Sequence, residues 1–257
     1  MCLIAIAFKT QINLPLVVVA NRDEFNSRPS AAMHWWSTQD ILAGRDLRGG
    51  GTWLGVSSTG RFAALTNYRG SADPPHSLSR GHLVSNFLAS TQPAWEWSQS
   101  IRSHLNRYCG FNLLMFDGQK LFYINNVDPV VISLKPNIYG LSNHGLDSDW
   151  PKVHYAKKRL QQRLNRASKS SSLDRTWPDD TANLLCRRSP YERQRLPDTG
   201  IPKILEKRLS APFITGKDYG TRASTAVVIR GNGAVSVVEH AHLNGELQGT
   251  QRFNYQL

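Results

Sequence analysis

The sequence predicts an α+β fold in a single domain over residues 1–257, and three observations support this class. Apolar runs at residues 2–8 and 14–20 are joined by a short polar connector, which predicts a β-hairpin. Residues 149–167 carry apolar side chains at helical spacing. Runs at residues 224–230 and 234–239 flank Gly-Asn-Gly, which predicts a second hairpin. Runs of strands with helices grouped between them are typical of layered α+β domains.

The remaining elements follow from the same rules. Turn residues at Gly60 and Gly118 separate apolar runs, and Pro202 stands in the first turn of a late helix, where proline is tolerated. The expected helix at residues 149–167 has one apolar face, and its basic residues, beginning with Lys152, are expected on a solvated face. Further strands are expected at residues 52–56, 61–67, 111–116, 121–125 and 130–134, further helices at 80–89, 179–187 and 201–209, and a polar linker at 169–172.

Composition narrows the classes of function. The formal net charge of +12 favours anionic partners, either nucleic acid or an anionic small molecule. No nucleic-acid motif accompanies the charge, so we expect no nucleic-acid partner. No apolar run approaches the roughly 20 residues of a membrane span, and the first residues lack the basic region of a leader peptide. A cytoplasmic protein without a membrane span is therefore expected.

Metal sites are not expected from the cysteines or histidines. The three cysteines have no metal-type spacing, and their odd number favours a reducing compartment. His240 and His242 lie on one face of an expected strand and suit a metal in principle, but a polar strand end is the favoured interpretation. His34, which precedes two tryptophans, is a candidate axial haem ligand, and the edge of an aromatic cluster is the favoured alternative.

Cys2 is the first candidate for chemistry. If Met1 is removed, as is expected when the next residue is small, Cys2 carries both a thiol and a free α-amine. Their ordinary pKa values are about 8.5 and about 7.7–8.0. Such an amine can accept the proton of its own side chain, which is the self-activation of N-terminal nucleophiles. The alternative is a small, buried apolar residue.

The segment that ends the second expected strand adds charge beside Cys2. The hairpin brings Arg22 back towards the start of the first strand, where a guanidinium would lower the pKa of the thiol. Asp23 or Glu24 would then orient the α-amine. The alternative is an ordinary solvated turn. Asn67 and Asn143 also end expected strands, and their side-chain amides are candidates for an oxyanion site; the alternative is that both are ordinary turn residues. Arg222 opens a late strand and would supply a further cation; the alternative is a surface arginine.

An ordered set of motifs is similar to one family. The chain resembles the NRDE family, also called the transport-and-Golgi-organisation protein 2 family, from residue 2 to residue 222. The matching motifs are MCLI at the start, ANRDEF at 20–25, SRP at 27–29, GGTWLG at 50–55, AALTNYR at 63–69, GFNL at 110–113, YGLSN at 139–143, LPD at 196–198 and YGTR at 219–222.

That family in turn resembles N-terminal-nucleophile hydrolases of the penicillin V acylase and bile-salt hydrolase kind. The resemblance implies a four-layer αββα sandwich with two antiparallel sheets. Adjacent side chains of a strand face opposite ways, so Glu24 is an alternative to Asp23 for the acidic role. The positions that match the site of those hydrolases are Cys2, Arg22, Asp23, Asn67, Asn143 and Arg222.

Two functions are expected from the resemblance, which attaches no established reaction to the family. The first is a cysteine amidohydrolase that acts on a C–N amide bond of an apolar, partly anionic small molecule, with Cys2 as nucleophile and no cofactor. The second is a non-catalytic protein that binds and traffics haem, acyl-CoA or lipid on the same fold. An apolar body with anionic groups would suit a basic pocket in either case.

Overall fold

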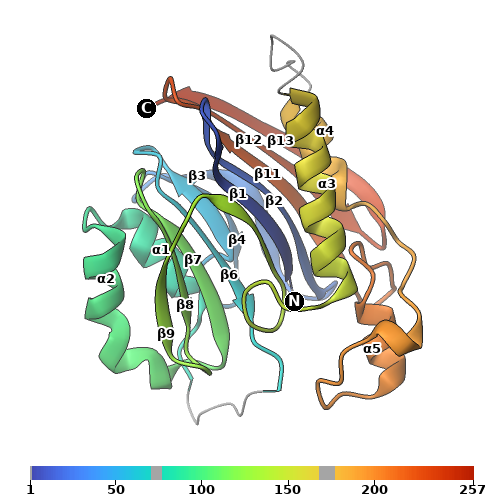
Figure 1. Ribbon diagram of the computed structural model, residues 1–257. Helices are drawn as coiled ribbons and strands as arrows, with labels where there is room; N and C mark the ends of the chain where they lie inside the picture. Colours follow the sequence, from blue (N-terminus) through green and yellow to red (C-terminus); the bar gives the residue numbers. More distant parts are fainter. Residues whose placement is uncertain (1, 71–76, 168–176) are drawn as a thin grey trace. The chain divides into compact units, whose positions relative to one another are not determined.

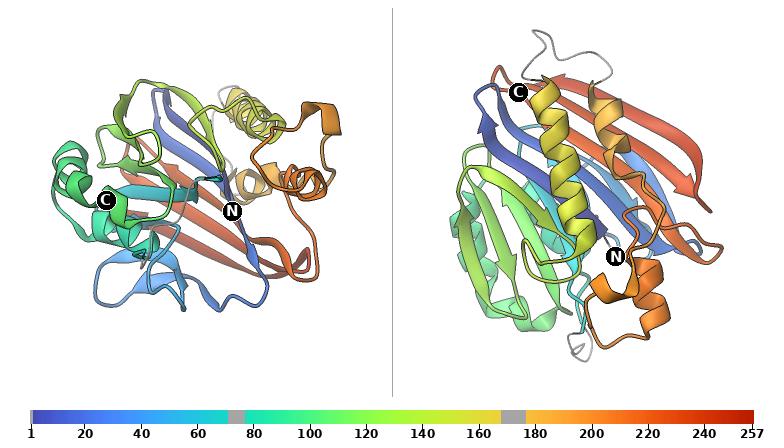
Figure 2. Two further views of the ribbon diagram at one scale, coloured as in Figure 1. Left: turned by 90° about the horizontal axis from the view of Figure 1, so that it is seen from below. Right: turned by 45° about the vertical axis from the view of Figure 1, so that its right-hand side comes forward.

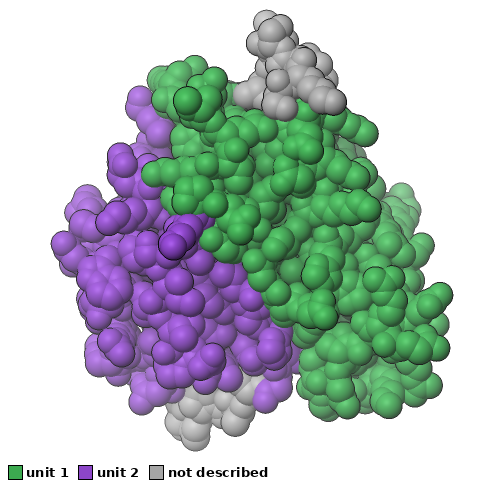
Figure 3. Space-filling view, in the orientation of Figure 1, with its two compact units in different colours: residues 1–27, 136–142, 147–256 green, residues 28–135, 143–146, 257 purple. Residues whose placement is uncertain are grey.

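The computed structural model describes residues 2–70, 77–167 and 177–257, so Met1 and the linker expected at residues 169–172 lie outside the described residues. The chain divides into two compact units, coloured separately in Figure 3. Unit 1 comprises Met1–Ser27, Pro136–Ser142 and Asp147–Gln256, and unit 2 comprises Arg28–Lys135, Asn143–Leu146 and Leu257. Each unit is described by itself below.

Unit 1 is built on a six-stranded antiparallel sheet with the strand order β10-β1-β2-β11-β12-β13 (Figure 1). The two predicted hairpins form its centre, since β1 pairs with β2 and β11 with β12. The strands are β1 (Cys2–Gln11), β2 (Leu14–Phe25), β10 (Asn137–Leu141), β11 (Tyr219–Ile229), β12 (Ala234–Leu243) and β13 (Glu246–Gln256).

One face of this sheet is covered by helices (Figure 2, right). Alternate residues of β1 and β2, such as Leu3 and Val19, pack with Val153 and Leu160 in one buried cluster. The alternation of the strands and the helical spacing of the partner therefore meet in one core. The helices of the unit are α3 (Pro151–Ala167), α4 (Trp177–Ala182) and α5 (Lys203–Leu209), with 3₁₀ turns η2 (Asn183–Leu185) and η3 (Arg193–Arg195).

Unit 2 holds a seven-stranded antiparallel sheet in sequential order from β3 to β9. Its core joins Phe87 and Trp97, from two helices, with strand residues such as Phe111 and Leu113. The strands are β3 (Ser30–Trp36), β4 (Ile41–Asp46), β5 (Leu54–Ser57), β6 (Phe62–Asn67), β7 (Phe111–Phe116), β8 (Leu121–Asn125) and β9 (Val130–Leu134), and the helices are α1 (Gly81–Ala89), α2 (Ala94–Ile101) and the 3₁₀ turn η1 (Arg102–Arg107).

Two antiparallel sheets with helices confirm the predicted α+β class, and each unit supplies one sheet and one set of helices. The helix predicted at residues 179–187 is wrong in its bounds. It begins at Trp177, with Pro178 in its first turn, and becomes a 3₁₀ turn at Asn183, a residue that favours turns over helix interiors. Within the described residues, no helix is both long and apolar enough to cross a membrane.

The packing of α3 on the sheet predicts a large cost for Leu160→Ala. Leu160 is fully buried in this core, and such truncations cost about 2–5 kcal/mol of unfolding free energy. Lys158→Ala, at an exposed position of the same helix, should change it by less than about 0.5 kcal/mol. Urea denaturation measures both variants, and equal effects would contradict this account of the core.

Candidate functional site

The pairing of β1 with β2 fixes the two central residues of the candidate site. Cys2 at the start of β1 lies directly opposite Arg22 near the end of β2. Directly opposite residues of antiparallel strands share a sheet face, with Cβ atoms about 4.5–5.5 Å apart. The thiol and the guanidinium therefore lie on the same face, as the hairpin predicted.

Burial has the largest effect on the pKa of the Cys2 thiol. Only 6% of Cys2 is exposed, and burial raises its pKa to about 11. The positive charges of the amino terminus and of Arg22 lower the pKa, but less than burial raises it, and Asp23 and Glu24 raise it further. Arg22 therefore lowers the pKa of the thiol, as the sequence predicts, but burial outweighs this cation and leaves the pKa raised.

The Arg22 guanidinium keeps its hydrogen-bonding capacity. Arg22 is 9% exposed, yet among the described residues none accepts a hydrogen bond from its side chain. A buried guanidinium with unused donors suits a planar anion such as a carboxylate, which binds in a bidentate manner. The site thus offers a cation beside the thiol.

Asp23 and Glu24 lie on opposite faces of the sheet, so the two acidic candidates have different surroundings. Asp23 is 1% exposed and lies opposite Thr221, whose hydroxyl donates to Asp23 Oδ1 at 2.7 Å. Burial raises the pKa of Asp23, and the positive amino terminus opposes this more than any other group does. Glu24 is half-buried and accepts from the N–H of Phe25. That amino terminus belongs to Met1, so the choice between Asp23 and Glu24 as the acidic partner of a Cys2 α-amine stays a prediction.

Arg222 lies in a β-bulge, where the pairing of β11 with β2 shifts between Thr221 and Ala223. Bulges re-aim a side chain locally. Its Nε donates to the carbonyl of His242, and Nη1 donates to the carbonyls of Phe25 and Asn26 at 3.1 and 2.9 Å. Burial, and then the charge of Arg22, lowers the pKa of Arg222. Arg222 therefore joins the ends of two strands and adds positive charge near Arg22.

Asn67 and Asn143 meet within unit 2. The Asn143 amide donates to the carbonyl of Asn67 at 2.9 Å, and the N–H of Arg69 donates to the carbonyl of Asn143 at 2.8 Å. The six candidate residues therefore form two groups: Cys2, Arg22, Asp23 and Arg222 in unit 1, and this pair in unit 2.

Asn112 anchors the loop after Asn143 and was missed as a positioning residue. Its amide donates to the carbonyl of His144 at 3.1 Å and to Thr66 Oγ1 at 3.0 Å. Its carbonyl oxygen accepts from the Tyr123 hydroxyl, which in turn accepts from the N–H of Leu146. The signal was present, because Asn112 belongs to the GFNL motif, but the motif alone does not show what the amide holds.

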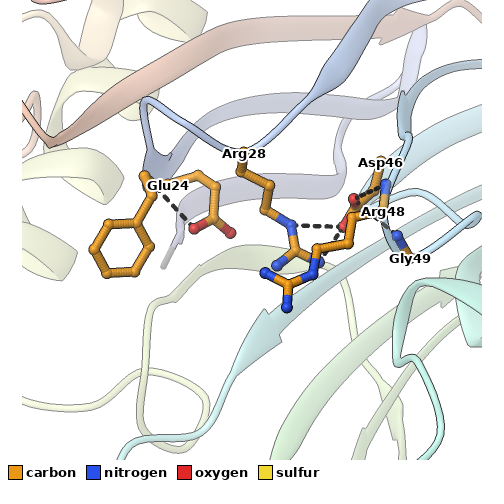
Figure 4. Close-up of polar contacts among 6 residues, drawn as sticks. Glu24, Arg28, Asp46, Arg48 and Gly49 are labelled. Atoms are coloured by element: carbon orange, nitrogen blue, oxygen red, sulfur yellow. Dashed lines mark hydrogen bonds and ion pairs between the residues drawn. The ribbon is translucent and has the colours of Figure 1, made fainter.

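Other motif residues build a loop of unit 2. Arg28, from SRP, donates twice to Asp46 Oδ2, at 3.0 and 2.7 Å, and Asp46 Oδ1 accepts from the N–H groups of Arg48 and Gly49 (Figure 4). Burial raises the pKa of Asp46, but these bonds outweigh it and leave the pKa lowered. A Cβ on Gly51, from GGTWLG, would lie 2.3 Å from a backbone carbon. These residues therefore shape the loop.

The described histidines were the candidates for a metal centre. Within the described ranges, no group of three or more His, Cys, Asp or Glu is placed to hold a metal ion. His240 and His242 have ring centroids 6.5 Å apart; His240 contacts Thr250, and His242 contacts Ser224. His34 is exposed on β3, with Nδ1 2.8 Å from the carbonyl of Ala32. The edge of an aromatic cluster remains the favoured interpretation of His34, and haem ligation the alternative.

Lys152 corrects the expectation for the basic helix face. The sequence predicts a solvated position for Lys152, yet only 3% of it is exposed, and its Nζ donates to the carbonyl of Leu209 at 3.0 Å. It also lowers the pKa of Asp23, after the amino terminus. Helical spacing alone placed it wrongly, because the segment that covers the first turn of α3 comes about 57 residues later in the chain.

Two antiparallel sheets with their helices are the α+β arrangement expected for the fold of N-terminal-nucleophile hydrolases. A Caenorhabditis elegans ortholog of N-acylethanolamine-hydrolyzing acid amidase has a similar fold, with a TM-score of 0.52 and 12% identity over 88% of this chain and 92% of that chain. The chain belongs to the transport and Golgi organisation 2 family, whose sequence profile matches residues 1–244.

Curated relatives agree with this membership. The Mus musculus transport and Golgi organization 2 homolog is 32% identical over 94% of this chain and 91% of that protein. The Homo sapiens homolog is 31% identical over the same shares of the two chains, and the Drosophila melanogaster protein 22% identical over 87% of this chain and 85% of that protein. The family expected from the motifs is therefore confirmed.

The buried thiol predicts slow alkylation while Met1 is in place. With an uncleaved N-terminal extension, Cys2 should react with iodoacetamide half-maximally near pH 11, because the thiolate is the reactive form. Exposed Cys186 is the internal reference and should react faster near pH 7.5. Peptide mass spectrometry measures both rates. Equal rates at pH 7.5 in the extended protein would contradict the account of burial.

Proposed function

We propose that this protein is a cysteine hydrolase that cleaves a C–N amide bond of an apolar, partly anionic small molecule, with Cys2 as nucleophile. The observation that carries the proposal is the pairing of Cys2 with Arg22 at the end of a buried hairpin, with Asp23 next along the strand. A structural cysteine needs neither an unpaired cation nor a buried carboxylate beside it. A nucleophile that must lose a proton uses both.

The first half of the proposed reaction forms an acyl-enzyme. After loss of Met1, the neutral α-amine of Cys2 takes the proton of its thiol, and Sγ attacks the substrate carbonyl. A C–S bond forms, and the carbonyl electron pair moves to oxygen. When the C–N bond breaks, the α-ammonium returns its proton to the leaving amine. Asp23 stabilises the ammonium while it exists.

The second half hydrolyses the thioester. Water attacks the acyl carbon and loses its proton to the α-amine; the C–S bond then breaks, and the thiol is protonated again as the carboxylic acid leaves. By the family resemblance, Asn67 and Asn143 stabilise the oxyanion in both steps. Removal of one oxyanion donor costs about 10²–10³-fold in rate, so Asn143→Ala should lose that much turnover.

Arg22 and Arg222 indicate the charge of the substrate. Among the described residues none accepts a hydrogen bond from the Arg22 side chain, and the charge of Arg22, after burial, lowers the pKa of Arg222, so the two guanidinium groups influence each other. Two cations of like charge are costly to bring together without an anion between or beside them. A carboxylate or phosphate on the ligand would meet this need, which supports a partly anionic substrate.

The same cations support the second candidate function, a carrier of haem or acyl-CoA that does not turn its ligand over. Haem propionates and the phosphates of acyl-CoA both pair well with guanidinium groups. In this alternative Cys2 contributes only packing. The two functions therefore differ in the role of the thiol and share the role of Arg22.

Incubation with a panel of acyl-amides and acyl-CoA thioesters, in parallel with haem titration, separates the two functions. The hydrolase should give product or an acyl adduct of Cys2 by intact mass, and Cys2→Ala should abolish both. Arg22→Ala should weaken binding of anionic ligands, whereas Arg193→Ala, at an exposed arginine, is the matched control. Saturable binding without product, unchanged by Cys2→Ala, would contradict the hydrolase and support the carrier.

A further inference from the structure

The helix α5 exposes its aliphatic side chains and buries its acidic one. In this helix 84% of Ile204 and 42% of Leu205 are exposed, whereas Glu206 is only 5% exposed. A surface helix of a globular protein ordinarily turns its apolar side chains to the core and its charged side chains to water. The reversal in α5 indicates a surface that contacts something less polar than water.

Hydrogen bonds on the inner side of the helix fix this orientation. Glu206 Oε1 accepts from the backbone N–H of Thr199 at 3.2 Å and from the Thr199 hydroxyl. A rotation of α5 that turned Ile204 inward would move the carboxyl group away from these donors, and a buried carboxyl group without hydrogen bonds is costly. Near the end of the helix, Arg208 Nη2 donates to the carbonyl of Tyr219 at 3.2 Å. The exposure of Ile204 is therefore built into the fold of unit 1.

Basic side chains surround the exposed aliphatic pair. Lys203, Lys207 and Arg208 are exposed on the same helix. The last two follow Ile204 by three and four positions, which places them beside it on the helix surface. The segment 187–208 contains seven Lys or Arg and three Asp or Glu, and one of the acidic residues is the inward-facing glutamate of α5. This surface therefore combines aliphatic side chains with an excess of positive charge.

We propose that α5 docks on an anionic lipid bilayer, with Ile204 and Leu205 inserted among the lipids and the three basic side chains of the helix against the headgroups. Aliphatic residues flanked by lysine and arginine bind such a surface without crossing it, because both the apolar burial and the attraction to anionic lipids contribute. The inference goes beyond the proposed function and does not depend on the role of Cys2.

Size and charge favour a bilayer over a protein partner. A specific protein–protein interface buries about 800 Å² on each partner, and aromatic residues are enriched at its centre while lysine is depleted there. The helix α5 contains no aromatic residue, and two aliphatic side chains beside two lysines supply only a small apolar centre. A lipid surface needs no large complementary centre, and lysine is suited to anionic headgroups.

The position of α5 relates this surface to the end of the sheet that carries Cys2. Figures 1 and 2 show α5 at the end of the unit 1 sheet where β1 begins. The segment that follows α5 contacts this end, since the Asn21 amide donates to the carbonyl of Pro212 at 2.8 Å and Asn21 directly precedes Arg22. Ligands with an apolar body and an anionic group partition into bilayers. Docking through α5 would bring unit 1 to a source of such ligands.

Sedimentation of the whole chain with lipid vesicles tests the proposal. Vesicles of phosphatidylserine and phosphatidylcholine in equal parts should bind the protein, and vesicles of phosphatidylcholine alone should bind it much less. Ile204→Asn should lower the partition coefficient about tenfold or more, because an aliphatic side chain no longer leaves water. Ile12→Asn is the matched control and should leave binding unchanged, since Ile12 is 96% exposed in the turn between β1 and β2, away from α5. Equal binding by wild type and Ile204→Asn would overturn the proposal.

The contribution of charge has its own control. Lys203→Gln combined with Lys207→Gln should weaken binding to the mixed vesicles, whereas Lys120→Gln combined with Lys158→Gln removes the same charge from exposed positions elsewhere and should change little. A rise in salt from about 0.1 M to about 1 M should release the wild type, because the Debye length falls from about 10 Å to about 3 Å. Equal losses in the two double variants would show a general attraction of a basic protein and would contradict a specific role of α5.

A gain of binding and the oligomeric state complete the test. Ile204→Trp should strengthen binding to the mixed vesicles, because tryptophan prefers the membrane interface and damage to the fold does not produce a gain. An unchanged partition coefficient for Ile204→Trp would contradict insertion of this side chain. Sedimentation velocity without lipid examines the other occupant: a wild-type dimer that Ile204→Asn dissociates, together with no binding to vesicles, would assign α5 to a second copy of the chain and overturn the proposal.

Discussion

The pairing of β1 with β2 is the constraint on which the unit 1 group depends. It sets Cys2 opposite Arg22, and a shift of one residue would turn one of them to the other face of the sheet. The pairing is fixed by apolar side chains on both strands, such as Leu3 and Val19, which are fully buried. The buried residues that stabilise the core therefore also fix the register that places the thiol opposite the guanidinium. A substitution that shifted this register would change both the stability of the sheet and the geometry of the site.

Burial gives this site its main electrostatic property. The Cys2 thiol and the Asp23 carboxyl are both driven towards their neutral forms, and cations only partly offset the effect. A buried thiol that is protonated near neutral pH is inert, which protects it from oxidation and alkylation. Only a base within the same buried space can activate it, and the α-amine of Cys2 itself is such a base. In the proposed mechanism, removal of Met1 would therefore be the step that converts a protected thiol into a nucleophile.

The sequence predicted the parts of this site that depend on local pattern and chain order. The two apolar runs and their short polar connector were enough to place Arg22 beside Cys2, and the motifs identified the family. It did not predict effects that need distant segments: the net rise in the thiol pKa depends on everything packed around Cys2, and Lys152 is buried by a segment about 57 residues further along. Likewise the edge strand β13 was missed, because its polar sequence lacks alternation and pairing with β12 alone makes it a strand.

The central claim is that Cys2 acts as an N-terminal residue, and the mass of the mature protein tests it most directly. Intact-mass measurement on protein isolated from its native host should show a chain shorter by one methionine, with Cys2 at its amino terminus. A free α-amine on Cys2 is required, since an amide nitrogen cannot accept the thiol proton. Quantitative retention of Met1 would contradict the self-activated mechanism and leave Cys2 as a buried structural residue.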